Sequence, residues 1–180
     1  MPRLFTGIEV PPAIRTTLSF LQTGFKDVRW IEPSDFHITL RFIGDVSPAM
    51  GDDIVDALSG RSWVAPTIQL DELKCFGGST PKSIYASIAA NDALSSLAAS
   101  QERLMQQLGL PADSRRFTPH ITVARCKGKA ANAVAHYLGE HAGYFTPPPY
   151  IPTRFVLYSA RESTGGGPYQ VEEIFPFKVR

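Results

Sequence analysis

The stretch FHITLRFIG at residues 36–44 decides the fold, because a close copy of it, PHITVARC, occurs at residues 119–126. Both copies share a four-residue frame of histidine, isoleucine, threonine and an aliphatic residue. Their apolar and β-branched composition predicts two buried strands. The chain has only four histidines, and two of them occupy this frame. A chance repeat is therefore a poor explanation, and the pair predicts a shared function.

The geometry of a strand predicts which side chains of the motif lie together. Side chains alternate between the two faces, so His37 and Thr39 share one face, about 6–7 Å apart, and the same holds for the second copy, His120 and Thr122. By the same alternation Arg41 joins the polar face of its strand. Arg125 points away from its histidine unless a bulge intervenes. We therefore expect Arg41 rather than Arg125 to lie in the site.

Two imidazoles and two hydroxyls in one cleft suit the cleavage of a phosphodiester. One group must take a proton from the attacking oxygen, another must protonate the leaving oxygen, and donors must hold the phosphate oxygens. Histidine fits both proton roles because its ordinary pKa lies near neutrality. The threonine hydroxyls fit the role of donors to phosphate.

Two other interpretations of the histidines compete with this one. A single histidine on a strand is more often a hydrogen-bonded structural residue, but two in register argue against that. A metal site needs further ligands at suitable spacing, and neither motif has an acidic residue or a third histidine beside it. His136 and His141 are five residues apart on a predicted helix and share no face. We expect no metal and no cofactor.

The segments around the two motifs occur in the same order, with an offset near eighty residues. Each half reads as helix, histidine strand, helix, strand, strand, which suggests an internal duplication. This order predicts an α+β fold with two similar lobes related by a pseudo-twofold axis, each with an antiparallel sheet and helices. We expect the active-site cleft between the lobes. The whole chain, 1–180, would be one bilobal domain with approximate halves 1–90 and 91–180.

Periodicity and end signals predict the individual elements. Pro11 and Pro12 open a helix with Ile14, Leu18, Leu21 and Phe25 on one face. Ser47 is the predicted N-cap of a helix that ends at Gly60, and Asn91 that of a helix that ends at Gly109. Residues 164–168 read as a flexible loop. The predicted strands cover 4–10, 28–31, 36–43, 66–73, 83–89, 117–126, 154–160 and 169–177, and the remaining helices cover 48–59, 92–108 and 130–140.

Composition limits the classes of function. With 43% hydrophobic and 19% charged residues, the 180-residue chain fits a globular protein, and a net charge of +1 argues against a surface that coats nucleic acid. Contact with nucleic acid should be small and local, at one end of a strand or at one nucleotide. The two cysteines predict no disulfide framework, and no apolar run is long enough to cross a membrane. We expect a cytoplasmic monomer.

The chain resembles the two-histidine (2H) phosphoesterases, specifically the LigT-like or ThpR-like bacterial RNA 2′,3′-cyclic phosphodiesterases. The similarity covers nearly the whole chain, through RLF at 3–5 and IEVP at 8–11, RWI at 29–31, FHITLRFIG at 36–44, and RFTPHITVAR at 116–125. A departure occurs near residues 82–85. There the family usually has arginine and then tryptophan, whereas this chain has Lys82 and Tyr85.

The resemblance implies metal-independent hydrolysis of a 2′,3′-cyclic phosphate to a 2′-phosphate, and possible joining of tRNA halves through a 2′,5′ linkage. By motif position His37 is the expected proton donor and His120 the proton acceptor. Thr39, Thr122, Arg41 and Arg125 are the candidate phosphate ligands, and Tyr85, Trp30 and Tyr169 the candidates for base stacking. The alternatives are a phosphodiesterase for other cyclic or 2′,5′-linked nucleotides, and a non-catalytic module that binds RNA ends.

Overall fold

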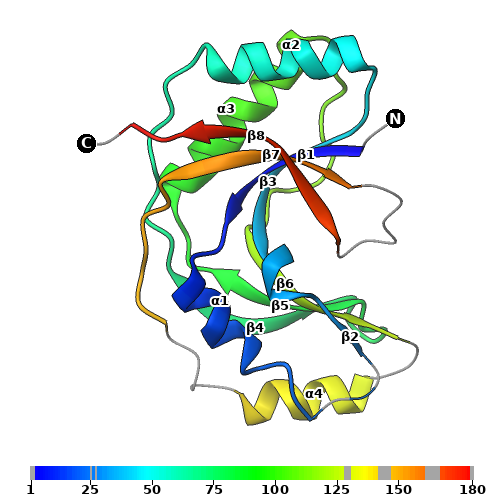
Figure 1. The fold of residues 1–180 in the computed structure, drawn as a ribbon. Coiled ribbons are helices and arrows are strands. Elements are labelled where there is room, and N and C mark those ends of the chain that lie inside the picture. The colour runs from blue at the N-terminus through cyan, green and yellow to red at the C-terminus, as the bar shows by residue number, and fades with distance from the viewer. Residues whose placement is uncertain are drawn as a thin grey trace.

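The computed structural model describes residues 3–24, 26, 28–127, 131–141, 147–160 and 167–178. Two four-stranded antiparallel sheets face each other across the middle of the molecule (Figure 1). The first sheet has the strand order β3 (His37–Asp45), β1 (Arg3–Glu9), β7 (Arg154–Ala160) and β8 (Tyr169–Pro176). The second has the order β2 (Val28–Trp30), β6 (His120–Cys126), β5 (Ser83–Ile88) and β4 (Leu70–Phe76).

Helices cover the outer face of each sheet. The helices α2 (Pro48–Ser59) and α3 (Asp92–Gln107) lie over the first sheet, and α1 (Pro12–Ser19) and α4 (Ala131–Glu140) lie over the second (Figure 1). The predicted N-caps are confirmed: the Ser47 and Asn91 side chains accept hydrogen bonds from the backbone N–H groups of Met50 and Leu94. This α+β arrangement of two similar lobes is the fold expected from the repeat.

The two sequence halves do not coincide with the two sheets. Starting from the histidine strand, the order β3-β1-β7 in the first sheet corresponds to the order β6-β5-β4 in the second. Yet β7, in the first sheet, comes from the second half of the chain, and β4, in the second sheet, comes from the first half. The helices exchange too, because α1 follows β1 but lies over the second sheet, and α3 follows β5 but lies over the first (Figure 1). Each half therefore gives one helix and more than one strand to the other lobe: β2, β4 and β5 lie in the sheet of β6, and β7 and β8 lie in the sheet of β1 and β3. Order along the chain could not reveal this exchange, because strand pairing is non-local.

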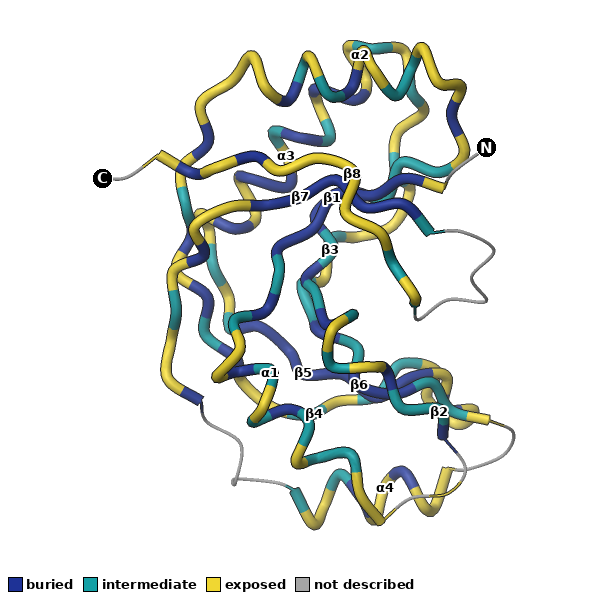
Figure 2. Tube along the Cα trace, in the orientation of Figure 1, coloured by how far each residue is buried: buried dark blue, intermediate teal, exposed yellow. Residues whose placement is uncertain are grey.

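The histidine strands are held from behind by a continuous apolar core. Ile8, Ile38, Ile84 and Ile121 have no exposed surface and belong to one cluster that joins both sheets. Buried positions concentrate on the strands and on the helix faces that meet them (Figure 2). This packing fixes the backbone from which the motif histidines project. No helix among the described residues is long and apolar enough to span a membrane.

Several predicted boundaries are corrected by the structure. The strand predicted at 66–73 begins only at Leu70, because Ile68 pairs its backbone with Tyr150 instead of with β5. The strand predicted from Phe117 begins at His120, and the first helix ends at Ser19, before Leu21. Of the positions named in the sequence predictions, Phe25 and residues 164–166 of the predicted loop lie outside the described residues.

Candidate active site

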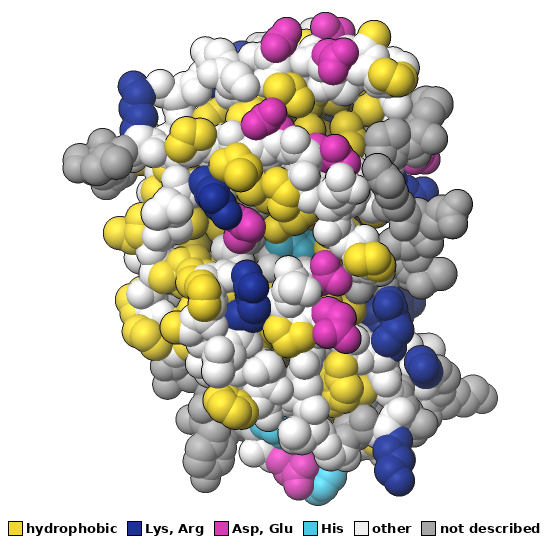
Figure 3. All heavy atoms as spheres, in the orientation of Figure 1, with side chains coloured by type: hydrophobic (Ala, Val, Ile, Leu, Met, Phe, Trp, Pro, Cys, Tyr) yellow, Lys and Arg dark blue, Asp and Glu magenta, His cyan; other side chains and the backbone are white. Residues whose placement is uncertain are grey.

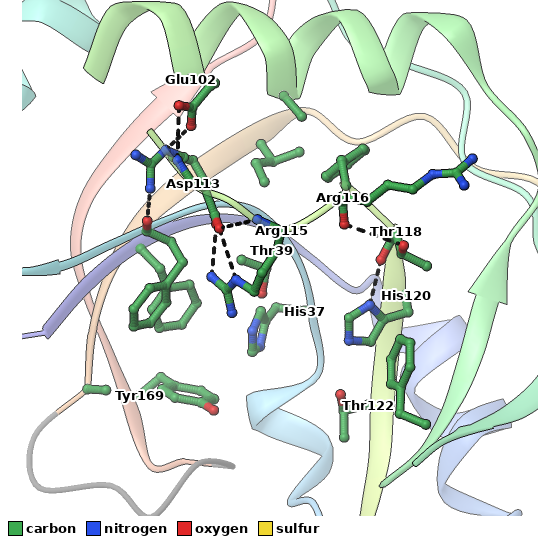
Figure 4. Close-up of a pocket in the computed structure, with 18 of the residues that line it drawn as sticks. His37, Thr39, Glu102, Asp113, Arg115, Arg116, Thr118, His120, Thr122 and Tyr169 are labelled. Carbon is green, nitrogen blue, oxygen red and sulfur yellow. Dashed lines mark hydrogen bonds and ion pairs between the residues drawn. The ribbon is translucent and has the colours of Figure 1, made fainter. Parts of the chain in front are cut away.

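A cleft of about 850 Å³ opens between the two sheets and contains both motif histidines and both motif threonines. Figure 4 shows the two imidazole rings next to each other, with Thr39 and Thr122 beside them. In the space-filling view, histidine atoms are visible in a recess near the middle of the molecule (Figure 3). The cleft volume lies within the range of roughly 300–1,000 Å³ that is typical of small-molecule sites. The fold therefore brings the two motifs together in one cleft.

Both histidines are oriented by the same backbone contact. Nδ1 of His37 lies 2.7 Å from the carbonyl oxygen of Asp35, and Nδ1 of His120 lies 2.7 Å from the carbonyl oxygen of Thr118. A carbonyl oxygen can only accept, so Nδ1 carries the hydrogen in each ring. The neutral ring then has its lone pair on Nε2, the atom that remains for proton exchange with a ligand.

Each histidine strand contains a β-bulge directly after its threonine. In the first sheet Gly7 faces Thr39 and Thr6 faces Arg41, which leaves Leu40 without a facing residue. In the second sheet Tyr85 faces Thr122 and Ile84 faces Ala124, which leaves Val123 without one. The order of buried and half-buried residues is identical along His37–Ile43 and His120–Cys126. The two strands are therefore equivalent beyond the four-residue motif.

The bulges reverse the arrangement that strict alternation predicts for the two arginines. Arg125 returns to the face of its histidine and lines the cleft. Its guanidinium makes no hydrogen bond or ion pair within the described part of the chain, and its Nε is buried without a partner. The expectation that Arg125 points away from the site is therefore wrong, because the extra residue in the strand shifts the alternation by one.

Arg41 shows the opposite change. The residue also borders the cleft, but it is only 5% exposed. Its guanidinium forms an ion pair with Glu102 of α3 and donates hydrogen bonds to the carbonyl oxygens of Phe42 and, at 2.6 Å, of Pro111. Since both Nη atoms donate to protein carbonyls and Nε lies against the Glu102 carboxylate, although without a hydrogen bond, we assign Arg41 to the connection between β3 and α3 rather than to a ligand.

The two histidines differ in their surroundings. Three rings, those of Phe5, Tyr158 and Tyr169, lie with their centroids 5.0–5.4 Å from the centroid of the His37 ring. The pKa of His37 is lowered to about 4, mainly by burial; the contact with the Asp35 carbonyl raises it in part, and the nearby His120 and Arg125 add to the lowering. Burial and Arg125 also lower the pKa of His120. In the unliganded cleft at neutral pH, His37 is therefore neutral.

This burial predicts that the stability of the protein depends on His37 in mild acid. Between pH 6.5 and about 4 the unfolded chain binds a proton that folded His37 does not, so the free energy of unfolding falls as the pH falls. The full effect is about 3 kcal/mol. Urea unfolding at pH 7 and pH 4.5 should therefore show a smaller loss for His37→Asn than for the wild type. An equal loss in both proteins would contradict the assigned environment, and His136→Asn, at an exposed position on α4, is the control.

Of the three residues proposed for base stacking, one lines the cleft and two do not. Tyr169 lines it, whereas Trp30 packs against Tyr137 of α4. Tyr85 is buried, with its ring stacked on Phe76 at 4.0 Å and the edge of His120 at 5.2 Å, so it supports the histidine and offers no face to a base. The sequence interpretation missed the phenylalanines that border the cleft, which are Phe5, Phe42, Phe76 and Phe117.

Asp35 and Gly7 are further residues that the sequence interpretation missed. The Asp35 carbonyl orients His37, and its carboxylate accepts a hydrogen bond from the backbone N–H of Tyr169, which places that ring beside the histidine. Gly7 lies opposite Thr39, and a Cβ there would meet the carbonyl oxygen of Ile38 at 3.0 Å and the ring of Tyr158 at 3.2 Å. Only long-range packing gives these two residues their roles.

No group of three or more histidine, cysteine, aspartate or glutamate side chains suited to a metal occurs among the described residues. The threonine hydroxyls of both motifs lie in the cleft, where their role as phosphate donors remains a prediction. The arrangement as it stands offers two Nε2 atoms, two hydroxyls and the guanidinium of Arg125, whose buried Nε has no partner among the described residues.

Relatives of this chain carry one recurrent name. A sequence 28% identical over 148 residues, covering 78% of this chain and 84% of the relative, is the RNA 2′,3′-cyclic phosphodiesterase of Archaeoglobus fulgidus. Proteins of the same name match from Geobacillus stearothermophilus, at 34% identity, and Aeropyrum pernix, at 30%. Those two matches cover 53% and 56% of this chain, and they span only 32% and 58% of the relatives' own lengths.

Solved structures share the fold over almost the full length. E. coli LigT in complex with 3′-AMP superposes with a TM-score of 0.79 at 21% identity, covering 99% of this chain and all of that one. A protein of Thermus thermophilus superposes with a TM-score of 0.80 at 22% identity, covering 97% of both chains. The profile of the 2′-5′ RNA ligase superfamily matches residues 10–164, which include both histidine motifs. The chain thus belongs to the 2′-5′ RNA ligase superfamily of two-histidine phosphoesterases.

Proposed function

We propose that this protein is an RNA 2′,3′-cyclic phosphodiesterase that opens a terminal cyclic phosphate to a 2′-phosphate by acid-base catalysis. The observation that carries this proposal is the pair of equivalent histidines in one cleft, each with its Nδ1 fixed by a backbone carbonyl. The name shared by the relatives supports the choice of substrate. An RNA end is a partner of the size that the cleft can accept.

In the proposed reaction the two histidines have opposite roles. Nε2 of His120 takes a proton from water, and the water oxygen attacks phosphorus. The bond between phosphorus and the 3′ oxygen breaks, and Nε2 of His37 gives its proton to that oxygen. The products are a free 3′-hydroxyl and a 2′-phosphate. Ligation would follow the same course with a 5′-hydroxyl in place of water: His120 takes its proton, the 5′ oxygen attacks phosphorus, and the 3′ oxygen leaves with the proton of His37, which gives a 2′,5′ linkage. Cleavage of that linkage would exchange the proton roles.

The electrostatics of the cleft place a condition on this mechanism. His37 must be protonated before it can act as a donor, although its pKa in the unliganded cleft is about 4. A bound phosphate brings a negative charge next to the ring and favours the charged imidazolium. Substrate binding therefore favours the protonated form of His37 that the donor role requires. Thr39, Thr122 and Arg125 would stabilise the phosphate oxygens, on which negative charge increases during the attack.

The experiment that tests this proposal supplies a nucleoside 2′,3′-cyclic phosphate in the presence of excess EDTA. We expect turnover unchanged by the chelator and a 2′-phosphate as the product, measured by chromatography against both isomers. Loss of activity on chelation, restored by a divalent cation, would contradict the metal-independent mechanism. A predominantly 3′-phosphate product would contradict the leaving group assigned here. Turnover of 2′,5′-linked or other cyclic nucleotides alone would favour the alternative phosphodiesterase.

A further inference from the structure

One end of the cleft contains two arginines on an aromatic ring that the proposed chemistry does not use. The guanidinium carbon of Arg3 lies 5.8 Å from the centroid of the Phe42 ring, and that of Arg115 lies 5.3 Å from the same centroid. All three residues line the cleft. Contacts of this kind hold a guanidinium in place while its N–H groups stay available to a ligand.

The equivalence of the two histidine strands relates this end of the cleft to the position of Arg125. Counted from the histidine, and with the same bulge, Phe42 occupies on β3 the position that Arg125 occupies on β6. Arg125 brings a cation to the reacting phosphate directly. At the matching position the first lobe has a ring with two cations held against it. The cleft therefore has positive charge at two places related by the pseudo-twofold axis.

The two arginines keep donors free for an anion. Asp113 accepts hydrogen bonds from Nε and one Nη of Arg115, at 3.0 and 2.9 Å, and a guanidinium has five N–H groups, so three remain. Arg3 is more than half exposed and lies 3.9 Å from Asp45, a loose contact. Glu102 is paired with Arg41, and Asp113 with Arg115, so Arg115 offers N–H donors with its charge largely offset, while the weakly paired Arg3 supplies the positive charge of this end.

We propose that Arg3 and Arg115, held against Phe42, form a second anion subsite that binds the phosphate on the 5′ oxygen of the terminal nucleotide. This inference rests on the proposed function, since the cyclic phosphate is taken to bind at the histidines. The ribose of an RNA end carries the cyclic phosphate on one side and the 5′ phosphodiester on the other. Guanidinium groups at two separate places in the cleft would offer donors to both phosphates of such an end. The subsite would make the enzyme prefer an RNA end to a mononucleoside cyclic phosphate.

Equilibrium binding tests the subsite without any need for turnover. The dissociation constants of adenosine 2′-phosphate and adenosine 2′,5′-bisphosphate are measured by calorimetry for the wild-type protein and for Arg3→Gln/Arg115→Gln. We expect the bisphosphate to bind the wild type roughly tenfold more tightly, as one added charged hydrogen-bonding contact implies. In the double variant the ratio of the two constants should fall to near one. Arg103→Gln removes an exposed arginine of α3 and should keep the wild-type ratio.

Two results would overturn the subsite: equal affinities for the two ligands in the wild type, or an unchanged ratio in the double variant with its fold intact by circular dichroism. The conservative Arg3→Lys/Arg115→Lys variant should retain part of the preference, since it keeps the charges and loses the planar fork. Failure of the proposed function gives a different pattern. In that case the preference for the bisphosphate persists while cyclic phosphates are not hydrolysed.

Discussion

Replacing His37 or His120 with alanine is expected to lower the turnover of a nucleoside 2′,3′-cyclic phosphate by at least about 10²-fold. Each ring supplies one of the two proton transfers, and no other described residue places an imidazole in the cleft. The double variant should lose little more than either single variant, because the two rings act as a unit in one reaction. Initial rates at saturating substrate measure both effects.

The control for this prediction is His136→Ala. His136 is an exposed residue of α4 that is paired with Glu140, outside the cleft, and its loss should leave the rate near that of the wild type. If both His37→Ala and His120→Ala kept near-normal turnover, the acid-base pair would have to be abandoned. If only one did, the mechanism would need water or another group in that role.

Replacing Arg125 with glutamine is expected to lower kcat/KM by roughly 10²-fold, the loss typical of a donor that stabilises charge in the transition state. Its guanidinium has no described protein partner and lines the cleft. A second readout comes from the pH profile of kcat/KM. Arg125 lowers the pKa of both histidines, so its loss should move the profile to higher pH.

Arg41→Gln provides the matched comparison, since it removes the same charge from the equivalent strand. Because Arg41 is buried and paired with Glu102, its loss leaves an uncompensated carboxylate and should lower the melting temperature more than Arg125→Gln does. The opposite pattern, a stable Arg41 variant with poor catalysis and an active Arg125 variant, would show that the bulges do not assign the two arginines as described.

Much of the site could be predicted from the sequence because the motif is local. The spacing of His37 and Thr39 on one strand, and its repetition at His120 and Thr122, places all four groups once the two strands face the same cleft. The capping residues Ser47 and Asn91 were likewise predictable, since a cap bonds to the helix that directly follows it.

The bulges and the aromatic surroundings of the histidines could not be predicted in this way. Whether Leu40 or Val123 has a facing residue depends on the register with β1 and β5, strands far away in the chain. The rings that surround His37 come from β1, β7 and β8, and those next to His120 come from β4 and β5. Neither arrangement leaves a signal within the motif itself.

The sequence by itself determined the groups of the candidate site: a duplicated frame whose histidines and threonines share a strand face, within an α+β fold of two similar lobes. Tertiary structure alone decided which arginine keeps its guanidinium unpaired in the cleft, which lobe each helix and strand joins, and how far the pKa of His37 falls. The physical reason is the range of the interactions. Alternation along a strand acts between neighbours, whereas register, strand exchange and desolvation depend on residues brought together only by folding.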